Sequence, residues 1–287
     1  MVAGAFPQEL KPEWVDVDFE KEARRCGREL GCVWEEAEVR DQIIAATSFE
    51  ASGISVIAED DWKEVFDEKQ GYSLRSLALP RKDQDGEGSC TSNNQTRGFE
   101  YTFARSYGRA FWISFSPMSL YQLCASSSGS GSSLSCNITK ARDVGFLPSD
   151  TPENRKRFGS MVLKDVGYSQ RSNPRPDGWQ EFAKQFRIRE YVKLTTVEQF
   201  ASCLLMDLPI SYGRSGHAIC GGALVWRNGR WYVAYDNSWG AGWGDDGWGY
   251  DTLSSRLLGY GVYASTAIWH PQVEGLHLPP TPYNLVM

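Results

Sequence analysis

The sequence predicts an α+β chain whose helical first half faces a β-rich second half. Residues 17–45 are rich in Glu, Arg and Ala, and Phe99 and Phe103 lie four residues apart after Cys90, which is the spacing of one helix face. In the last third, apolar and polar residues alternate or β-branched and aromatic residues dominate, in residues 186–194, 209–213, 217–226 and 230–237. Helices and strands that are segregated along a chain are typical of α+β folds.

The remaining elements follow in chain order. Residues 1–16 are predicted to be extended, residues 17–45 helical and residues 46–82 mixed. A helix begins at Cys90, and the low-complexity stretch 126–133 is predicted to be a flexible loop. A short helix follows this loop, with Ser132 or Ser133 as its N-cap and Gly145 at its end.

Composition narrows the class of protein. The 287 residues are 41% hydrophobic and 23% charged, with a net charge of −6, which is typical of a soluble globular chain. Lys and Arg form no cluster of the kind that binds nucleic acid, so we expect no nucleic-acid partner. No apolar run reaches the ~18 residues of a membrane span, so we expect no membrane partner. The first residues lack the basic and apolar regions of a signal peptide, so we expect a cytoplasmic protein.

Cysteine and histidine usage predicts neither a metal site nor a cofactor. The seven cysteines are odd in number and form no CxxC pair, and neither they nor the three histidines have zinc-site spacing. We therefore expect no metal, no cofactor and mostly reduced thiols in a reducing compartment.

Cys90 is the candidate nucleophile. A thiol at a helix N-terminus lies at the positive end of the helix dipole, which stabilises the reactive thiolate. The alternative is that Cys90 is a small buried apolar residue, as many free cysteines are.

A nucleophilic cysteine needs a base, and the base needs a group that orients it. His217 begins one predicted strand, and Asn237 ends the next. An Asn side-chain oxygen can accept the imidazole N–H without adding charge. The alternatives are a histidine with no catalytic role and an aromatic, glycine-rich run that serves packing alone.

The motifs GSC, GHAI and NSWGAGWGDDGWGY, in this order, resemble those of the papain-like cysteine peptidases. That family has its His and Asn about 130–150 residues after the Cys, and here the offsets are 127 and 147. Gln84 precedes Cys90 by six residues, which is the offset of the family's oxyanion-hole glutamine. The resemblance covers about residues 75–260.

The resemblance implies a papain-like fold and a role for each matching residue. Cys90 is the nucleophile, His217 exchanges its proton and Asn237 orients His217. Gln84 and the Cys90 backbone N–H form the oxyanion hole. Trp239 shields the His217–Asn237 hydrogen bond and, with the glycine-serine wall formed by Gly131, Ser132 and Ser133, borders the substrate cleft.

The sequence also departs from the family pattern. Glu87 replaces the first cysteine of the C-G-[SA]-C-[WY] signature, Asp85 replaces a glycine, and Thr91 replaces the aromatic residue. GSCT is similar to the divergent bacterial and phage-encoded members. No inhibitory pro-segment pattern is present in residues 1–75, so we expect residues 1–16 to leave the cleft open.

We therefore expect two regions. Residues 1–75 form a partly helical extension that caps the fold or docks it on a partner. Residues 76–287 form the peptidase domain, with a helical half at about 84–180, a β half at about 181–270 and a C-terminal tail.

Three functions remain open. The first is a cysteine endopeptidase that acts on a peptide or protein substrate. The second is a papain-like structural or docking component of a larger assembly, such as a virion. The third is a transferase that passes the same acyl group to an amine.

The Asn228-Gly229 hairpin signal tests the pairing of His217 with Asn237. With a two-residue turn, Asn237 faces Cys220 and its side chain points away from the face of His217. We favour a three-residue loop at residues 227–229, which places Asn237 opposite Ile219. A bulge at Gly221-Gly222 is the alternative that restores the same face.

Overall fold

The computed structural model describes residues 5–126, 130–273, 276 and 278. Its α-helices are α1 (Phe19–Cys26), α2 (Ala37–Ile44), α3 (Trp62–Glu68), α4 (Cys90–Tyr107), α5 (Met118–Cys124), α6 (Leu134–Asp143), α7 (Pro152–Phe158), α8 (Trp179–Ala183) and α9 (Val197–Leu205). Its strands are β1 (Cys32–Val33), β2 (Thr47–Ser48), β3 (Ser132–Ser133), β4 (Ile188–Leu194), β5 (Ile210–Arg214), β6 (His217–Arg227), β7 (Arg230–Asp236), β8 (Trp248–Thr252) and β9 (Val262–Ile268).

The strands of the second half form one mostly antiparallel sheet in the order β2-β4-β9-β5-β6-β7-β8. Among the strands of the described residues in this sheet, only the edge strand β2, from the N-terminal region, joins in parallel, on β4. Strands β1 and β3 form a separate parallel pair. The predicted α+β class is therefore confirmed.

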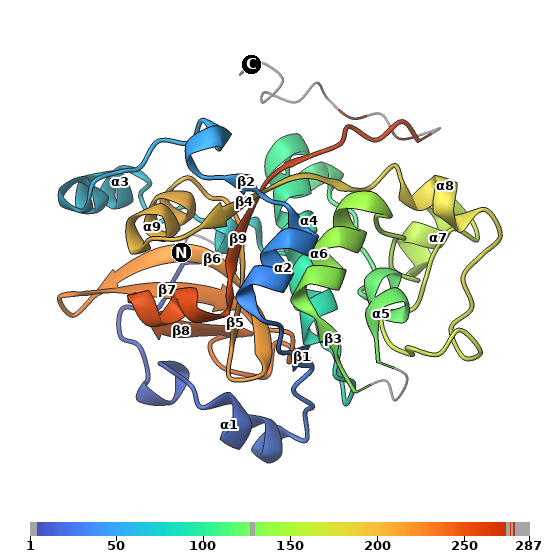
Figure 1. Ribbon diagram of the computed structural model, residues 1–287, viewed down its shortest axis with the longest axis horizontal. Helices are drawn as coiled ribbons and strands as arrows, with labels where there is room; N and C mark the ends of the chain where they lie inside the picture. Colours follow the sequence, from blue (N-terminus) through green and yellow to red (C-terminus); the bar gives the residue numbers. More distant parts are fainter. Residues whose placement is uncertain (1–4, 127–129, 274–275, 277, 279–287) are drawn as a thin grey trace.

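Figure 1 shows α5, α7 and α8 on one side of the molecule and the sheet, with α3 and α9, on the other. Helix α4 lies between the two sides, and its polar as well as its apolar residues are buried. One apolar cluster joins α9 to the sheet, and a second, with Phe99 and Phe103, joins α4 to α6. The thiol-bearing helix therefore lies where the two halves meet.

Local signals placed most of these elements correctly. Helix α4 begins at Cys90 as predicted, and Ser133 caps α6 by accepting a hydrogen bond from the backbone N–H of Cys136. The predicted strands correspond to β4, β5, β6 and β7. No helix among the described residues is long and apolar enough to cross a membrane.

The continuous helix predicted over residues 17–45 is wrong. Helix α1 ends at Gly27, which has a left-handed φ of 64°, and the chain becomes extended before α2 begins at Ala37. Glycine adopts this conformation without the steric cost of a side chain, so it ends helices readily. The extended part, residues 28–33, runs into the candidate site.

Candidate active site

Cys90 begins helix α4 and is fully buried. Burial raises the pKa of its thiol, and backbone N–H groups that point at the sulfur, among them those of Ala218 and Gly31, oppose this rise. Ala218 directly follows His217 along the chain, so its hydrogen bond places the Cys90 sulfur close to His217. The helix N-terminus favours a thiolate, but with water excluded the thiol keeps its proton.

His217 and Asn237 form the pair that the sequence predicted. His217 Nε2 and Asn237 Oδ1 are 2.7 Å apart, and both residues are buried. Because an amide oxygen can only accept, Nε2 carries the proton. Nδ1 is left as the basic nitrogen, and it has no hydrogen-bond partner among the described residues. Burial lowers the pKa of His217 to about 4, against the raising effect of the bond to Asn237.

The β6–β7 hairpin brings Asn237 to this face through a bulge. Arg227 pairs with Arg230, so the turn has two residues, and the favoured three-residue loop is wrong. Asn228 and Gly229 both have positive φ, as a tight turn of this kind requires. The register then shifts between Gly221 and Ala223, which confirms the alternative bulge. A Cβ at Gly222 would lie 2.7 Å from the Trp248 ring, so glycine suits the bulge.

Gln84 and Trp239 lie against this pair. The Gln84 side chain is fully buried, and its oxygen accepts hydrogen bonds from Ser238 Oγ at 2.6 Å and Trp239 Nε1 at 3.1 Å. These bonds orient the Gln84 amide nitrogen toward the backbone oxygens of Glu29 and Glu87, at 2.9 and 2.7 Å. The Trp239 ring lies over His217 with ring centroids 4.8 Å apart.

The glycine-serine wall (residues 131–133) packs against the start of α4, beside Cys90. Ser132 Oγ lies 2.5 Å from Thr91 Oγ1, next to the candidate nucleophile. Residues 127–129 of the predicted flexible loop lie outside the described residues. A disulfide between Cys124 and Cys136 closes the loop that carries the wall. These two cysteines depart from the expectation of mostly reduced thiols, whereas the other five are free.

Residues 28–33, here called the occluding segment, fill the cleft between the two walls. The backbone oxygen of Glu29 accepts from Gln84, and that of Gly31 accepts from Ser132 N at 2.9 Å. On the other wall, Cys32 N donates to Gly216 O at 2.9 Å. The segment thus bonds the groups expected to hold substrate backbone and oxyanion.

Two further contacts hold this part of the chain. Phe19 is fully buried, and its ring centroid lies 4.7 Å from that of His217. Arg28 forms ion pairs with Asp83 at 2.8 Å and Asp85 at 3.5 Å. Residues 5–16 are not in the cleft, since Val15 bridges to Tyr250 of β8 and Phe6 packs on Trp248. The prediction for residues 1–16 thus holds for residues 5–16, but the occluding segment was not predicted.

Sequence reasoning also missed the structural role of Glu87. One oxygen of its carboxylate accepts hydrogen bonds from the backbone N–H groups of Gly167 and Tyr168. Glu87 therefore ties the loop before Cys90 to residues 167–168 through hydrogen bonds, at a position where the resembling family has a cysteine. The two glycines Gly27 and Gly31, four positions apart around the end of α1, were the available signal for the occluding segment.

Comparisons with known proteins identify the fold. Neither protein-family models nor curated protein sequences give a match. Among solved structures, a procathepsin L2 proteinase from Tenebrio molitor larval midgut matches at 15% identity over 91% of this chain and 84% of its own, with a TM-score of 0.55. Procathepsin B from Trypanosoma congolense matches at 11% identity, over 85% and 88% of the two chains, with a TM-score of 0.54. Xylellain, a cysteine protease from Xylella fastidiosa, matches at 15% identity over 84% and 98%, with a TM-score of 0.50.

Proposed function

Because the chain has the papain-like fold, we propose that it is a cysteine endopeptidase that hydrolyses peptide bonds through an acyl-enzyme on Cys90. The observation that carries this proposal is the buried His217–Asn237 pair beside a thiol at the start of α4. The similar structures are cysteine proteases by name, and this supports the same chemistry. The occluding segment keeps the enzyme latent in the conformation described above.

The proposed reaction uses each group of the site in turn. His217 Nδ1 takes the Cys90 proton, and the sulfur attacks the carbonyl carbon of the scissile bond. The Gln84 amide and the Cys90 backbone N–H stabilise the negative oxygen of the tetrahedral intermediate. The protonated His217 then gives its proton to the leaving amine. A thioester remains, and a water activated by His217 hydrolyses it to release the acid and the free thiol.

The closed conformation suppresses this reaction in two ways. The occluding segment fills the space of a substrate and takes the Gln84 hydrogen bond meant for the oxyanion. It also excludes water, which leaves both the thiol and the imidazole neutral, because burial disfavours their charged forms. Activity therefore requires the segment to move or to be cut.

The test is labelling and hydrolysis with the intact chain. A thiol-directed epoxide should modify Cys90 and spare the other four free thiols, as mapped by peptide mass spectrometry. Fluorescent casein should be cleaved once the segment is displaced, and Cys90→Ser should abolish cleavage. A reactive Cys90 with no cleavage of any protein would contradict the proposal and favour a docking module. Product formed only with an added amine would indicate a transferase.

A further inference from the structure

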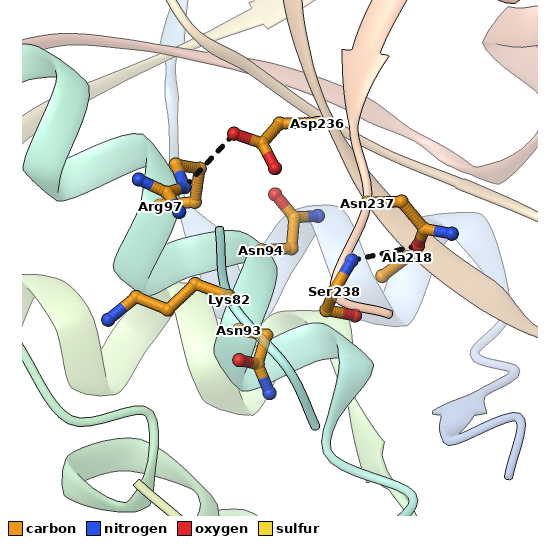
Figure 2. Close-up of a pocket in the computed structure, with 8 residues that line it drawn as sticks. All are labelled: Lys82, Asn93, Asn94, Arg97, Ala218, Asp236, Asn237 and Ser238. Carbon is orange, nitrogen blue, oxygen red and sulfur yellow. Dashed lines mark hydrogen bonds and ion pairs between the residues drawn. The ribbon is translucent and has the colours of Figure 1, made fainter. Parts of the chain in front are cut away.

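Asp236, the residue before Asn237, is a buried carboxylate with three partners. Its side chain is 1% exposed and lies 3.2 Å from Arg97 Nε and 3.1 Å from Arg81 Nη1. Tyr101 donates its hydroxyl to the same carboxylate at 2.5 Å. Figure 2 shows Arg97 and Asp236 bordering a small polar cavity that Asn237 also lines.

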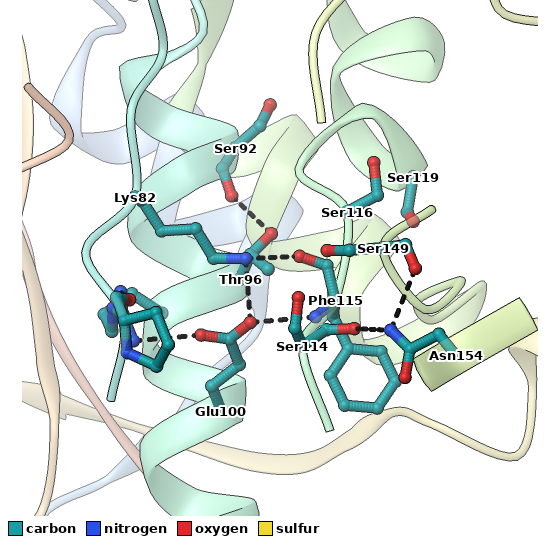
Figure 3. Close-up of polar contacts among 12 residues, drawn as sticks. Lys82, Ser92, Thr96, Glu100, Ser114, Phe115, Ser116, Ser119, Ser149 and Asn154 are labelled. Carbon is teal, nitrogen blue, oxygen red and sulfur yellow. Dashed lines mark hydrogen bonds and ion pairs between the residues drawn. The ribbon is translucent and has the colours of Figure 1, made fainter. Parts of the chain in front are cut away.

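Arg97 lies on the helix that begins with the candidate nucleophile. It is seven residues after Cys90 in α4, so it lies two helical turns along the same element. Glu100 pairs with Arg97 at 3.0 Å and with Lys82 at 2.8 Å, and Lys82 also donates to the backbone oxygen of Phe115 (Figure 3). Arg97 is thus held in place by groups of the helical half.

The network joins the two parts of the proposed site. Other side-chain bonds from α4 reach different strands: Asn94 and Gln95 bond Ser211 of β5, and Thr102 bonds Ser265 of β9. Arg97 and Tyr101 instead reach the end of β7, one residue from Asn237. The link therefore runs from the helix of Cys90 to the strand that carries the partner of His217.

Stability alone does not explain why charges are buried here. Removing two charges from water is costly, and well-packed apolar residues often stabilise a protein as well as a buried ion pair does. A hydrogen bond to a charged carboxylate differs in being directional. Asp236 accepts two such bonds, from Arg81 Nη1 at 3.1 Å and from the Tyr101 hydroxyl at 2.5 Å, and Arg97 adds an ion pair at 3.2 Å. Together these contacts fix the relative position of the elements that carry them.

We propose that the Arg97–Asp236 ion pair, with Tyr101, is a positioning device that sets Asn237, and through it the His217 ring, relative to Cys90. This inference rests on the proposed function for the meaning of that geometry. Arg97, Asp236 and Tyr101 touch no reacting atom, so they are positioning residues. Loosening them should weaken the His217–Asn237 hydrogen bond and the reactivity of Cys90 while the fold persists.

The experiment removes both charges of the pair together, and the two buried charges that also contact them each keep another partner: Arg81 keeps Asp246 at 3.4 Å, and Glu100 keeps Lys82 at 2.8 Å. The variant is Arg97→Met/Asp236→Asn, and the control is Arg75→Met/Asp245→Asn, which removes a largely buried pair with a 2.5 Å contact elsewhere in the chain. The first readout is hydrogen exchange of the His217 Nε2–H, followed by NMR in the intact chain. We expect exchange to be about 10-fold faster in the variant, the equivalent of losing one hydrogen bond, and unchanged in the control.

The second readout is the rate and pH profile of Cys90 alkylation, with urea unfolding measured in parallel. We expect the variant to react roughly 10- to 100-fold more slowly than the control at matched stability, as misplaced catalytic groups do. Exchange and alkylation equal to those of the control would overturn the inference. If Cys90 stays unreactive and no protein is cleaved even after the occluding segment is displaced, while imidazole exchange is still faster in the variant, the proposed function is refuted and the positioning role is supported.

A milder pair of variants covers the case in which the double variant does not fold. Tyr101→Phe removes only the hydroxyl that bonds Asp236, and Tyr191→Phe removes a buried hydroxyl that bonds Gln95 of the same helix at 2.8 Å. Faster exchange of the His217 Nε2–H in Tyr101→Phe but not in Tyr191→Phe would support the inference. Equal exchange in the two would overturn it.

Discussion

Replacing Gly31 by alanine should open the cleft. An added Cβ at this position would lie 2.7 Å from Gly88 Cα and closer still to the Gly88 carbonyl, whereas carbon atoms in contact are normally ~3.5–4.0 Å apart. Gly88 has little room to retreat, because its own Cβ position is 3.0 Å from the backbone of Ser130. The occluding segment must therefore move away from the wall.

The size of the effect follows from the bonds that the segment would lose. The hydrogen bonds that join the segment to the two walls include those of Gln84 to Glu29 O, Ser132 N to Gly31 O, and Cys32 N to Gly216 O. At about 1 kcal/mol each, their loss shifts the balance toward the open form by about 3 kcal/mol, or roughly 100-fold. If Cys90 reacts only in the open form, its alkylation should accelerate by the same factor.

The assay is the rate of Cys90 alkylation by iodoacetamide, mapped by peptide mass spectrometry in Gly31→Ala and in the parent chain. Gly242→Ala is the matched control, because a Cβ there meets nothing within 4 Å. Gly242→Ala should react at the parent rate. A Gly31→Ala protein that stays folded and reacts no faster than Gly242→Ala would refute the occlusion reasoning.

Three more predictions follow from the closed site. Burial lowers the pKa of His217 to about 4 in the closed form, whereas an exposed histidine titrates near ~6.5. The opened form therefore binds more protons between pH 4 and 6.5. The free energy that favours the closed form over the opened form should fall by about 3 kcal/mol as the pH falls from 6.5 to 4. Hydrogen exchange of residues 28–33, corrected for intrinsic rates, should show this loss, and a His217→Gln variant with the same pH dependence would contradict it. Gln84→Ala removes a bond that holds the segment and also the proposed oxyanion donor, so Cys90 alkylation should rise while kcat on an opened enzyme falls by ~10²–10³. Parallel changes in the two rates would argue against this double role. Cys124→Ser/Cys136→Ser should lower the free energy of unfolding by about 3 kcal/mol, because the disulfide closes a short loop across a separation of 12 residues. In urea denaturation the double variant should unfold like the reduced parent chain. A urea midpoint equal to that of the oxidised parent chain would exclude a stabilising role for the disulfide.

Short-range signals identified the parts of the site. Cys90 at the start of α4, Ser133 as the cap of α6 and the strands that carry His217 and Asn237 follow from residues close in sequence. Hydrophobic periodicity, capping and turn chemistry act over a few residues, so the sequence alone displays them. The order and spacing of the motifs indicated the papain-like fold.

The pairing of His217 with Asn237 was partly predictable. Because side chains alternate between the two faces of a strand, Asn237 can share a face with His217 only if an extra residue is accommodated either in the turn or in β6. Both sites contain glycine, so local chemistry did not separate them. The tertiary structure places the bulge at Gly222, where the Trp248 ring from β8 occupies the space of a side chain.

Only the tertiary structure decided what fills the cleft and what holds the site together. The path of residues 28–33, the Cys124–Cys136 disulfide and the partners of Asp236 depend on contacts between residues far apart in sequence. The Arg97–Asp236 pair spans 139 positions, so neither residue carries a local mark of the other. Composition and motifs of this sequence thus determined which chemistry the chain can hold, whereas packing determined that the chemistry is closed off, because burial and pairing arise only when distant segments meet.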